Sequence, residues 1–129
     1  IFKEYPVFGV GVKNFRYESG KSKYFNEEHA ASMIRQSTHT HQIHLEFLSE
    51  TGMFGYLSFI IFIILSLIIS IKNFIKYKNL FQLAGMLFVL TSLIPILPSG
   101  SFLSTFNGAI FWINFSIMVG FSKTLKSKF

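Results

Sequence analysis

Three long apolar runs without a charged side chain constrain the fold of this chain more than any other feature. They cover residues 53–71, 80–97 and 102–121, which makes them 19, 18 and 20 residues long. A helix rises about 1.5 Å per residue, so each run is long enough to cross the roughly 30 Å hydrocarbon core of a bilayer. Backbone amides inside lipid must be hydrogen-bonded within their own segment, which favours helix over other structures. We therefore expect an all-α integral membrane protein with three transmembrane helices over these ranges.

A soluble protein whose helices form an entirely buried core is the alternative. Half of the 129 residues are apolar and 14% are charged, so few polar side chains remain to cover such a core. The composition therefore favours a lipid bilayer as the surroundings. The absence of cysteine excludes a disulfide framework, an iron–sulfur centre and a cysteine nucleophile. No signal peptide is visible, and a chain that begins with Ile1 instead of Met fits a fragment or a processed chain.

The net charge of +6 comes from two short lysine clusters. Residues 1–52 carry six basic and six acidic side chains, so they are neutral as a whole. The excess follows directly on the first and the third apolar run, at Lys72, Lys76, Lys78, Lys123, Lys126 and Lys128. This distribution argues against a nucleic-acid partner, which a basic face or stripe would indicate. Basic residues beside membrane spans stay in the cytoplasm, so we expect residues 1–52 outside and residues 53–129 as transmembrane helices with a short cytoplasmic tail.

The outer segment contains a glycine turn and a short amphipathic helix. Residues 6–15 read PVFGVGVKNF, in which the glycines allow the backbone to pass close to another element. After a polar stretch, a helix is expected to begin at about Thr40 and to run towards the first span, where Gly52 and Gly55 mark its meeting with the membrane. One face of this helix would carry His41, His44, Leu45 and Leu48, and another Ile43, Phe47 and Glu50.

Proline at the outer end of the second apolar run supports two interpretations. Pro95 removes a backbone donor and should kink the last turn of a helix over 80–97. Residues 95–104 would then form a partly re-entrant segment that faces a cavity. Alternatively, Pro95 and Pro98 simply end the helix before a turn.

His39, His41 and His44 form an HxHxxH cluster where the outer segment meets the first span. Imidazoles could bind zinc, could act as a general base with helpers, or could serve only as polar surface groups at the interface. The spacing is poor for a metal, because His39 and His41 precede or open the helix and no HExxH pattern follows. We therefore expect no metal site, and the other two roles remain open.

Arginines and acids in the outer segment offer a second kind of site. The guanidinium groups of Arg16 and Arg35 could hold phosphate oxygens in a fixed fork and offset charge on a departing pyrophosphate. Solvated loop arginines are the ordinary alternative. Glu46 and Glu50 could orient a histidine or an acceptor, and Glu50, close to the membrane boundary, is the less ordinary of the two.

Three stretches together resemble the C-terminal part of the O-antigen ligase and O-antigen polymerase family. They are PVFGVGVKNF at 6–15, HTHQIHLEFLSETGMFGYLSFI at 39–60 and IPILPSGSF at 94–102. The first element of the family pattern is matched by Pro6, Gly9, Gly11 and Phe15. The second is matched by His41, Leu45, Glu50, Gly52 and Gly55. Gln42 stands where the family has an asparagine.

The resemblance implies a GT-C-like helical bundle that performs inverting glycosyl transfer without a metal or cofactor. The reaction would take place at the periplasmic face of the bacterial inner membrane, with residues 1–52 in the periplasm. A glycan would move from an undecaprenyl-pyrophosphate carrier to a sugar hydroxyl on lipid A-core or on a growing glycan. We predict catalytic roles for His41 as general base, for Arg35 at the pyrophosphate and for Glu50. Substrate-binding roles are predicted for Arg16, His39, Gln42 and His44.

Two other functions remain open at this point. A related transferase could deliver the glycan to a protein rather than to a lipid. A non-catalytic membrane subunit or a transporter fragment is a different class, although a transporter is expected to place ionisable residues within its spans. The three predicted spans contain none.

Overall fold

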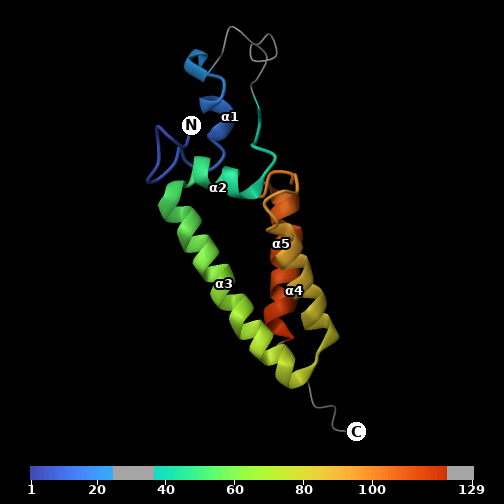
Figure 1. The fold of residues 1–129 in the computed structure, drawn as a ribbon. Coiled ribbons are helices and arrows are strands. Elements are labelled where there is room, and N and C mark those ends of the chain that lie inside the picture. Colours follow the sequence, from blue (N-terminus) through green and yellow to red (C-terminus); the bar gives the residue numbers. More distant parts are fainter. Residues whose placement is uncertain (25–36, 122–129) are drawn as a thin grey trace.

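The computed structural model describes residues 1–24 and 37–121, and these ranges fold as helices joined by loops, without a strand (Figure 1). Within these two ranges, five α-helices and one short 3-10 helix follow one another. Their bounds are α1 Phe15–Glu18, η1 Ser22–Tyr24, α2 Ile43–Glu50, α3 Gly52–Tyr77, α4 Leu80–Ser92 and α5 Thr105–Gly120.

The three longest helices and α2 enclose a triangular arrangement (Figure 1). Helices α4 and α5 run side by side as an antiparallel hairpin. Helix α3 is close to this hairpin at the C-terminal end of α3 and diverges from it towards the N-terminal end of α3. Helix α2 lies across the open end between α3 and the hairpin, and the N-terminal segment with α1 lies on the far side of α2. The all-α fold and the short helix before the first apolar run are therefore confirmed.

Helix α3 is longer than its apolar run. It has 26 residues and continues to Tyr77, so that Lys72 and Lys76 lie on its last turns and Lys78 ends it in the left-handed conformation (φ 53°). Within the described ranges, α3 is the one helix that is long and apolar enough to cross a membrane. Only 11% of its apolar stretch is buried, so most of its apolar surface lies on the outside of the molecule.

The hairpin helices are shorter than the apolar runs from which they form. Helix α4 ends at Ser92 after 13 residues, a length of about 20 Å, and α5 has 16 residues, about 24 Å. The prediction of a helix over 80–97 kinked at Pro95 is therefore wrong, whereas the alternative, that Pro95 and Pro98 end the helix before a turn, agrees with the structure. A residue before proline avoids the helical conformation and proline itself has no N–H to donate, so the chain leaves the helix before Pro95 is reached. Residues 93–104, called here the 93–104 segment, join α4 to α5 without forming a helix.

Close backbone contact holds the hairpin together. A Cβ at Gly85 of α4 would overlap the backbone of Asn114 and Met118 on α5, so only glycine permits this approach. The Gln82 side chain, fully buried, donates from Nε2 to the Met118 carbonyl at 3.2 Å. These contacts make α4 and α5 one packed unit.

Aromatic rings fill the space between α2, α3 and α5. Phe47 of α2 stacks on Phe59 of α3, with ring centroids 4.2 Å apart. Phe59 in turn contacts Phe102 and Phe111 at 5.5 and 6.2 Å. Such ring pairs stabilise packing beyond the area they bury, and here they position α2 relative to the long helices.

Candidate functional site

The glycine turn lies directly against the junction of α2 and α3. Gly9 and Gly52 both have a positive φ, 67° and 68°, and a side chain on either would overlap the backbone of the other's segment. The turn accepts hydrogen bonds from the first N–H groups of α3, because Met53 donates to the Pro6 carbonyl at 2.8 Å. It also donates to the end of α2, because the Gly11 N–H bonds to the Glu50 carbonyl at 2.9 Å. Free helix-end groups are thereby satisfied, and the prediction that the glycine turn at 6–15 permits a close backbone approach is confirmed at Gly9.

Glu50 connects the same turn to α1. Its side chain is 3% exposed, and it accepts a hydrogen bond from the Lys13 N–H at 2.5 Å. Burial raises the pKa of this carboxyl group, while hydrogen bonds from the Lys13 and Phe15 backbone oppose the rise. Glu50 therefore fixes the entry to α1.

Helix α2 begins later than expected, and His41 lies outside it. Gln42 is the N-cap residue, with extended backbone, and its Oε1 accepts from the Leu45 N–H at 2.7 Å. His41 has a φ of 55° and an exposed ring. The prediction that His41 shares a helical face with His44 is therefore wrong, because capping by Gln42 requires a non-helical backbone at this point.

Residues at the start of α2 are bonded to the 93–104 segment. The Gln42 Nε2 donates to the Pro95 carbonyl at 3.2 Å, and the His41 carbonyl accepts from the Ser99 N–H at 2.8 Å. His44 lies 2.9 Å from the Leu93 carbonyl through Nε2 and 3.0 Å from the Tyr56 hydroxyl through Nδ1. Since a carbonyl only accepts, Nε2 of His44 carries the proton, and both ring nitrogens are occupied.

Glu46, for which no catalytic or binding role was predicted, makes the shortest hydrogen bonds from α2 to the 93–104 segment. The side chain is 2% exposed and accepts from the Ser101 hydroxyl at 2.5 Å and from the Phe102 N–H at 2.6 Å. The helical periodicity of the sequence could have indicated that Glu46 is buried. Glu46 lies one turn before Glu50 on the buried face of α2, which also carries Ile43 and Phe47.

A polar cavity of about 430 Å³ lies between α1, the residues before α2 and the start of α5. Of the predicted site residues it brings together Arg16, His39 and Glu50. The His41 ring packs against the His39 ring, with centroids 4.1 Å apart, but does not line the cavity. Arg35 lies outside the described residues. The remaining lining residues are Lys13, Thr38, Gly100, Ser101, Leu103, Ser104, Thr105 and Asn107.

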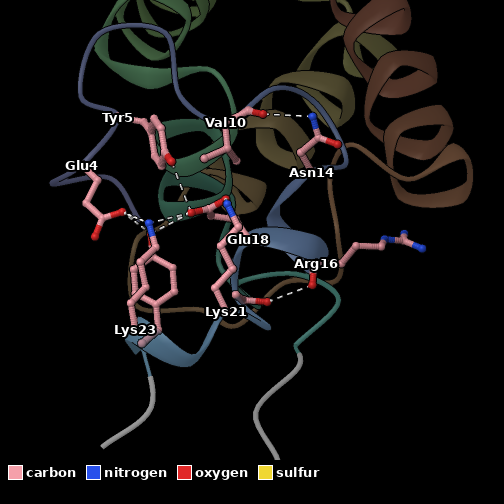
Figure 2. Close-up of polar contacts among 10 residues, drawn as sticks. Glu4, Tyr5, Val10, Asn14, Arg16, Glu18, Lys21 and Lys23 are labelled. Carbon is pink, nitrogen blue, oxygen red and sulfur yellow. Dashed lines mark hydrogen bonds and ion pairs between the residues drawn. The ribbon is translucent and has the colours of Figure 1, made fainter.

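Two lysines near Arg16, Lys21 and Lys23, are already paired with acidic side chains in a network of ion pairs (Figure 2). Lys21 and Lys23 both pair with Glu18, at 2.5 and 2.9 Å, and Lys23 also bonds to Glu4. The lysines, Lys21 most of all, lower the pKa of Glu18 to about 2. Glu4 likewise has a lowered pKa, chiefly through Lys23. These lysines therefore carry no unpaired charge towards the cavity.

Arg16 is different, because its side chain points away from this network (Figure 2). Across residues 1–24 and 37–121 it forms no ion pair. Arg16 and Lys13 thus bring two positive charges to the lining of the cavity, against one acid, Glu50, whose carboxyl group accepts from the Lys13 N–H. The cavity is suited to an anion.

The described part of the chain contains no group of three His, Cys, Asp or Glu side chains that could hold a metal ion. Comparisons with protein-family models, with curated proteins and with solved structures find no match to this chain. The functional proposal therefore depends on the residues and on their geometry.

Proposed function

We propose that this chain is the C-terminal part of an inverting glycosyltransferase of the bacterial inner membrane, of the O-antigen ligase or polymerase type. Its donor is a glycan on undecaprenyl pyrophosphate, and its acceptor is a sugar hydroxyl on lipid A-core or on a growing glycan. Residues 1–52 face the periplasm, and residues 53–129 lie in and below the bilayer. No metal or cofactor takes part.

The exposed apolar surface supports the membrane location. Helix α3 has the length and composition of a span and is hardly buried. The hairpin helices also expose large apolar side chains, among them Leu80, Phe81, Phe106 and Ile113. Since α4 and α5 are short for a crossing, the 93–104 segment would complete it. Non-helical backbone is tolerated at membrane depth where the protein satisfies it, and α2 bonds this segment at several points.

One observation carries the proposed activity: the polar cavity unites Arg16, His39 and Glu50, the last of which ends α2 just before α3 begins. These residues come from separate parts of the sequence, and the two basic residues of the lining, Lys13 and Arg16, outnumber its one acid, Glu50. A lipid-linked pyrophosphate presents its charge at headgroup depth, which is where a cavity at the end of a membrane helix would lie. The cavity therefore suits the head of the donor.

The proposed reaction needs one proton transfer and one displacement. His41, whose ring is exposed beside His39, takes the proton from the acceptor hydroxyl. The acceptor oxygen then attacks the anomeric carbon from the face opposite the pyrophosphate, and the bond to the pyrophosphate oxygen breaks with inversion. Arg16 and Arg35 offset the charge on the departing pyrophosphate, and Glu50 supports the arrangement from the cavity wall. Holding the hydroxyl and the anomeric carbon in line contributes much of the rate.

Gln42 and His44 were predicted to bind the substrate, and we now assign them an indirect role. Their polar atoms bond to Pro95 and Leu93. Their contribution to substrate binding would be to hold the 93–104 segment in place.

Single substitutions in the full-length protein test the proposal, with glycan transfer from the lipid-linked donor as the measurement. His41→Ala should lower transfer by about 10²–10⁴-fold, the usual contribution of a general base, at an unchanged protein level in the membrane. Arg35→Lys should lose part of the activity and Arg35→Ala more, because lysine keeps the charge without the guanidinium fork. His29→Ala, in the polar stretch before the histidine cluster, serves as the matched histidine control and should leave transfer unchanged.

Two results would change the proposal. An active His41→Ala protein beside an inactive His39→Ala protein would move the base to the residue that lines the cavity. Loss of transfer on chelation, restored by zinc, would instead favour a metal site in the histidine cluster.

A further inference from the structure

Two buried acids on α2 bond to two different segments of the chain. Glu46 and Glu50 are one helical turn apart, and both side chains are almost fully buried. Glu50 accepts from the Lys13 N–H, whereas Glu46 accepts from the Ser101 hydroxyl and the Phe102 N–H. The pair therefore connects α2 to the N-terminal segment on one side and to the 93–104 segment on the other.

Both of these segments line the polar cavity. Lys13 and Arg16 belong to the segment that Glu50 holds. Residues 100–105 belong to the stretch that Glu46 holds, and four of them besides Ser101 contact the cavity: Gly100, Leu103, Ser104 and Thr105. The spacing between Glu46 and Glu50 on one rigid helix thus determines how far apart these two walls lie.

A carboxylate is the side chain that this arrangement requires at position 46. The Ser101 hydroxyl bonds to Oε1 and the Phe102 N–H bonds to Oε2, so the two acceptor oxygens are used at the same time. A glutamine offers one acceptor oxygen only. Glu46 has no ion-pair partner in the described ranges, and a buried carboxylate without one is costly unless it is well hydrogen-bonded. Its two short hydrogen bonds meet this condition.

We propose that Glu46 is a positioning residue for glycan transfer: it holds Ser101 and Phe102 so that residues 100–105 form one wall of the donor-binding cavity. It does not contact the reacting atoms. This inference rests on the proposed function as far as the donor is concerned, whereas the positioning of the wall is independent of it.

The first experiment measures a cysteine-labelling rate and does not depend on glycan transfer. The 129 residues contain no cysteine, so in a full-length protein freed of any other cysteine, Leu103→Cys, half-buried in the wall, can be labelled alone with an impermeant maleimide. Glu46→Ala should raise the labelling rate of Leu103→Cys by about tenfold, because the two hydrogen bonds that hold the wall are lost. Ser22→Cys, exposed in η1 and distant from Glu46, is the matched control and should label at one rate in both backgrounds.

The second experiment uses transfer kinetics. Glu46→Ala should raise the KM for the lipid-linked donor by about tenfold with a smaller change in kcat, and Glu46→Gln should fall between it and the unsubstituted protein. In a double-mutant cycle, Ser101→Ala should add little to Glu46→Ala, because both remove the same bond. Glu46→Gln and Ser101→Ala carry the test if Glu46→Ala does not accumulate in the membrane.

The outcomes separate the two proposals. An unchanged labelling rate of Leu103→Cys in Glu46→Ala, or additive effects of Glu46→Ala and Ser101→Ala, would overturn the positioning role. A faster labelling rate in a protein that never transfers glycan would support the positioning role and remove the proposed function.

Discussion

Gly9 and Gly52 lie back to back where the N-terminal turn crosses the junction of α2 and α3, and the space for a Cβ on either is occupied by the backbone of the other segment. Both residues also have the left-handed backbone that favours glycine. Gly9 and Gly52, 43 positions apart in the sequence, are thus in direct backbone contact.

Alanine at Gly9 or Gly52 should therefore destabilise the protein strongly. The unfavourable φ alone costs about 1–3 kcal/mol, and the overlap with backbone atoms adds to it because backbone cannot move aside easily. The measurement is the unfolding midpoint in detergent. Gly120→Ala is the control, since a Cβ at Gly120 meets nothing within 4 Å and alanine favours helix. A Gly9→Ala protein as stable as Gly120→Ala would contradict the crossing.

His44 should matter for stability as well as for activity. His44→Ala removes the bond to the Leu93 carbonyl and the contact with Tyr56, at a cost of about 1–3 kcal/mol in the free energy of unfolding. Tyr56→Phe removes only the hydroxyl and should cost about 0.5–1.5 kcal/mol. In the double variant the Tyr56 substitution should add almost nothing. Full additivity would show that the two side chains do not interact.

Glu18 should stabilise the protein more at neutral than at acidic pH. The ion pairs with Lys21 and Lys23 lower its pKa from the ordinary 4.5 to about 2 in the folded state. The folded state thus binds this proton less tightly, so the stabilisation is present above pH 4.5 and is lost as the pH falls towards 2. Glu18→Gln should flatten the dependence of the unfolding midpoint on pH in this window. An unaltered slope would mean that the ion pairs do not act on Glu18.

Glu50 should have the opposite effect. Burial raises its pKa above the ordinary 4.5, so the folded state binds the proton more tightly. Its contribution is present below pH 4.5 and is lost as the pH rises through the folded-state pKa. Glu50→Gln should therefore reduce the loss of stability on that rise. Gln Oε1 can still accept from the Lys13 N–H, so the variant is expected to fold, and the measurement is again the unfolding midpoint against pH.

The topology can be tested by cysteine labelling of a full-length protein freed of any other cysteine, since these 129 residues contain none. Ser22→Cys should react with an impermeant thiol reagent in intact spheroplasts, because it is exposed in the outer segment. Lys76→Cys, exposed at the opposite end of α3, should react only after the membrane is opened. Labelling of Lys76→Cys alone in intact spheroplasts would invert the orientation and remove the cavity from the periplasm.

The local pattern of side chains was sufficient to predict which parts of the chain are helical. Helices form within all three apolar runs, and the close approach of the glycine turn was anticipated from Gly9. The ends of the helices were harder to predict. The apolar run continues to Leu97, yet α4 ends at Ser92. Pro95 disfavours helical backbone in the residue before it, and hydropathy does not report this effect.

The sequence pointed to three of the residues that line the polar cavity, but it did not predict how they are arranged. Arg16, His39 and Glu50 were singled out and line one cavity, whereas Glu46 was given less weight than the structure assigns it. His44 was placed with His41 on one helical face, but a cap at Gln42 separates them.

Residue type and order were enough to predict the helical class, the apolar runs, the positions of the charges and the close backbone approach of the glycine turn. These follow from properties of neighbouring residues: side-chain hydropathy, helical periodicity and backbone freedom. The partner of each polar group, by contrast, follows from the packing of the helices. The hydrogen bonds that Glu46 accepts from Ser101 and Phe102 span 55 and 56 positions, and the one that Glu50 accepts from Lys13 spans 37. Such bonds form because non-helical backbone needs donors and acceptors from elsewhere in the fold, and no local pattern specifies which residues will provide them.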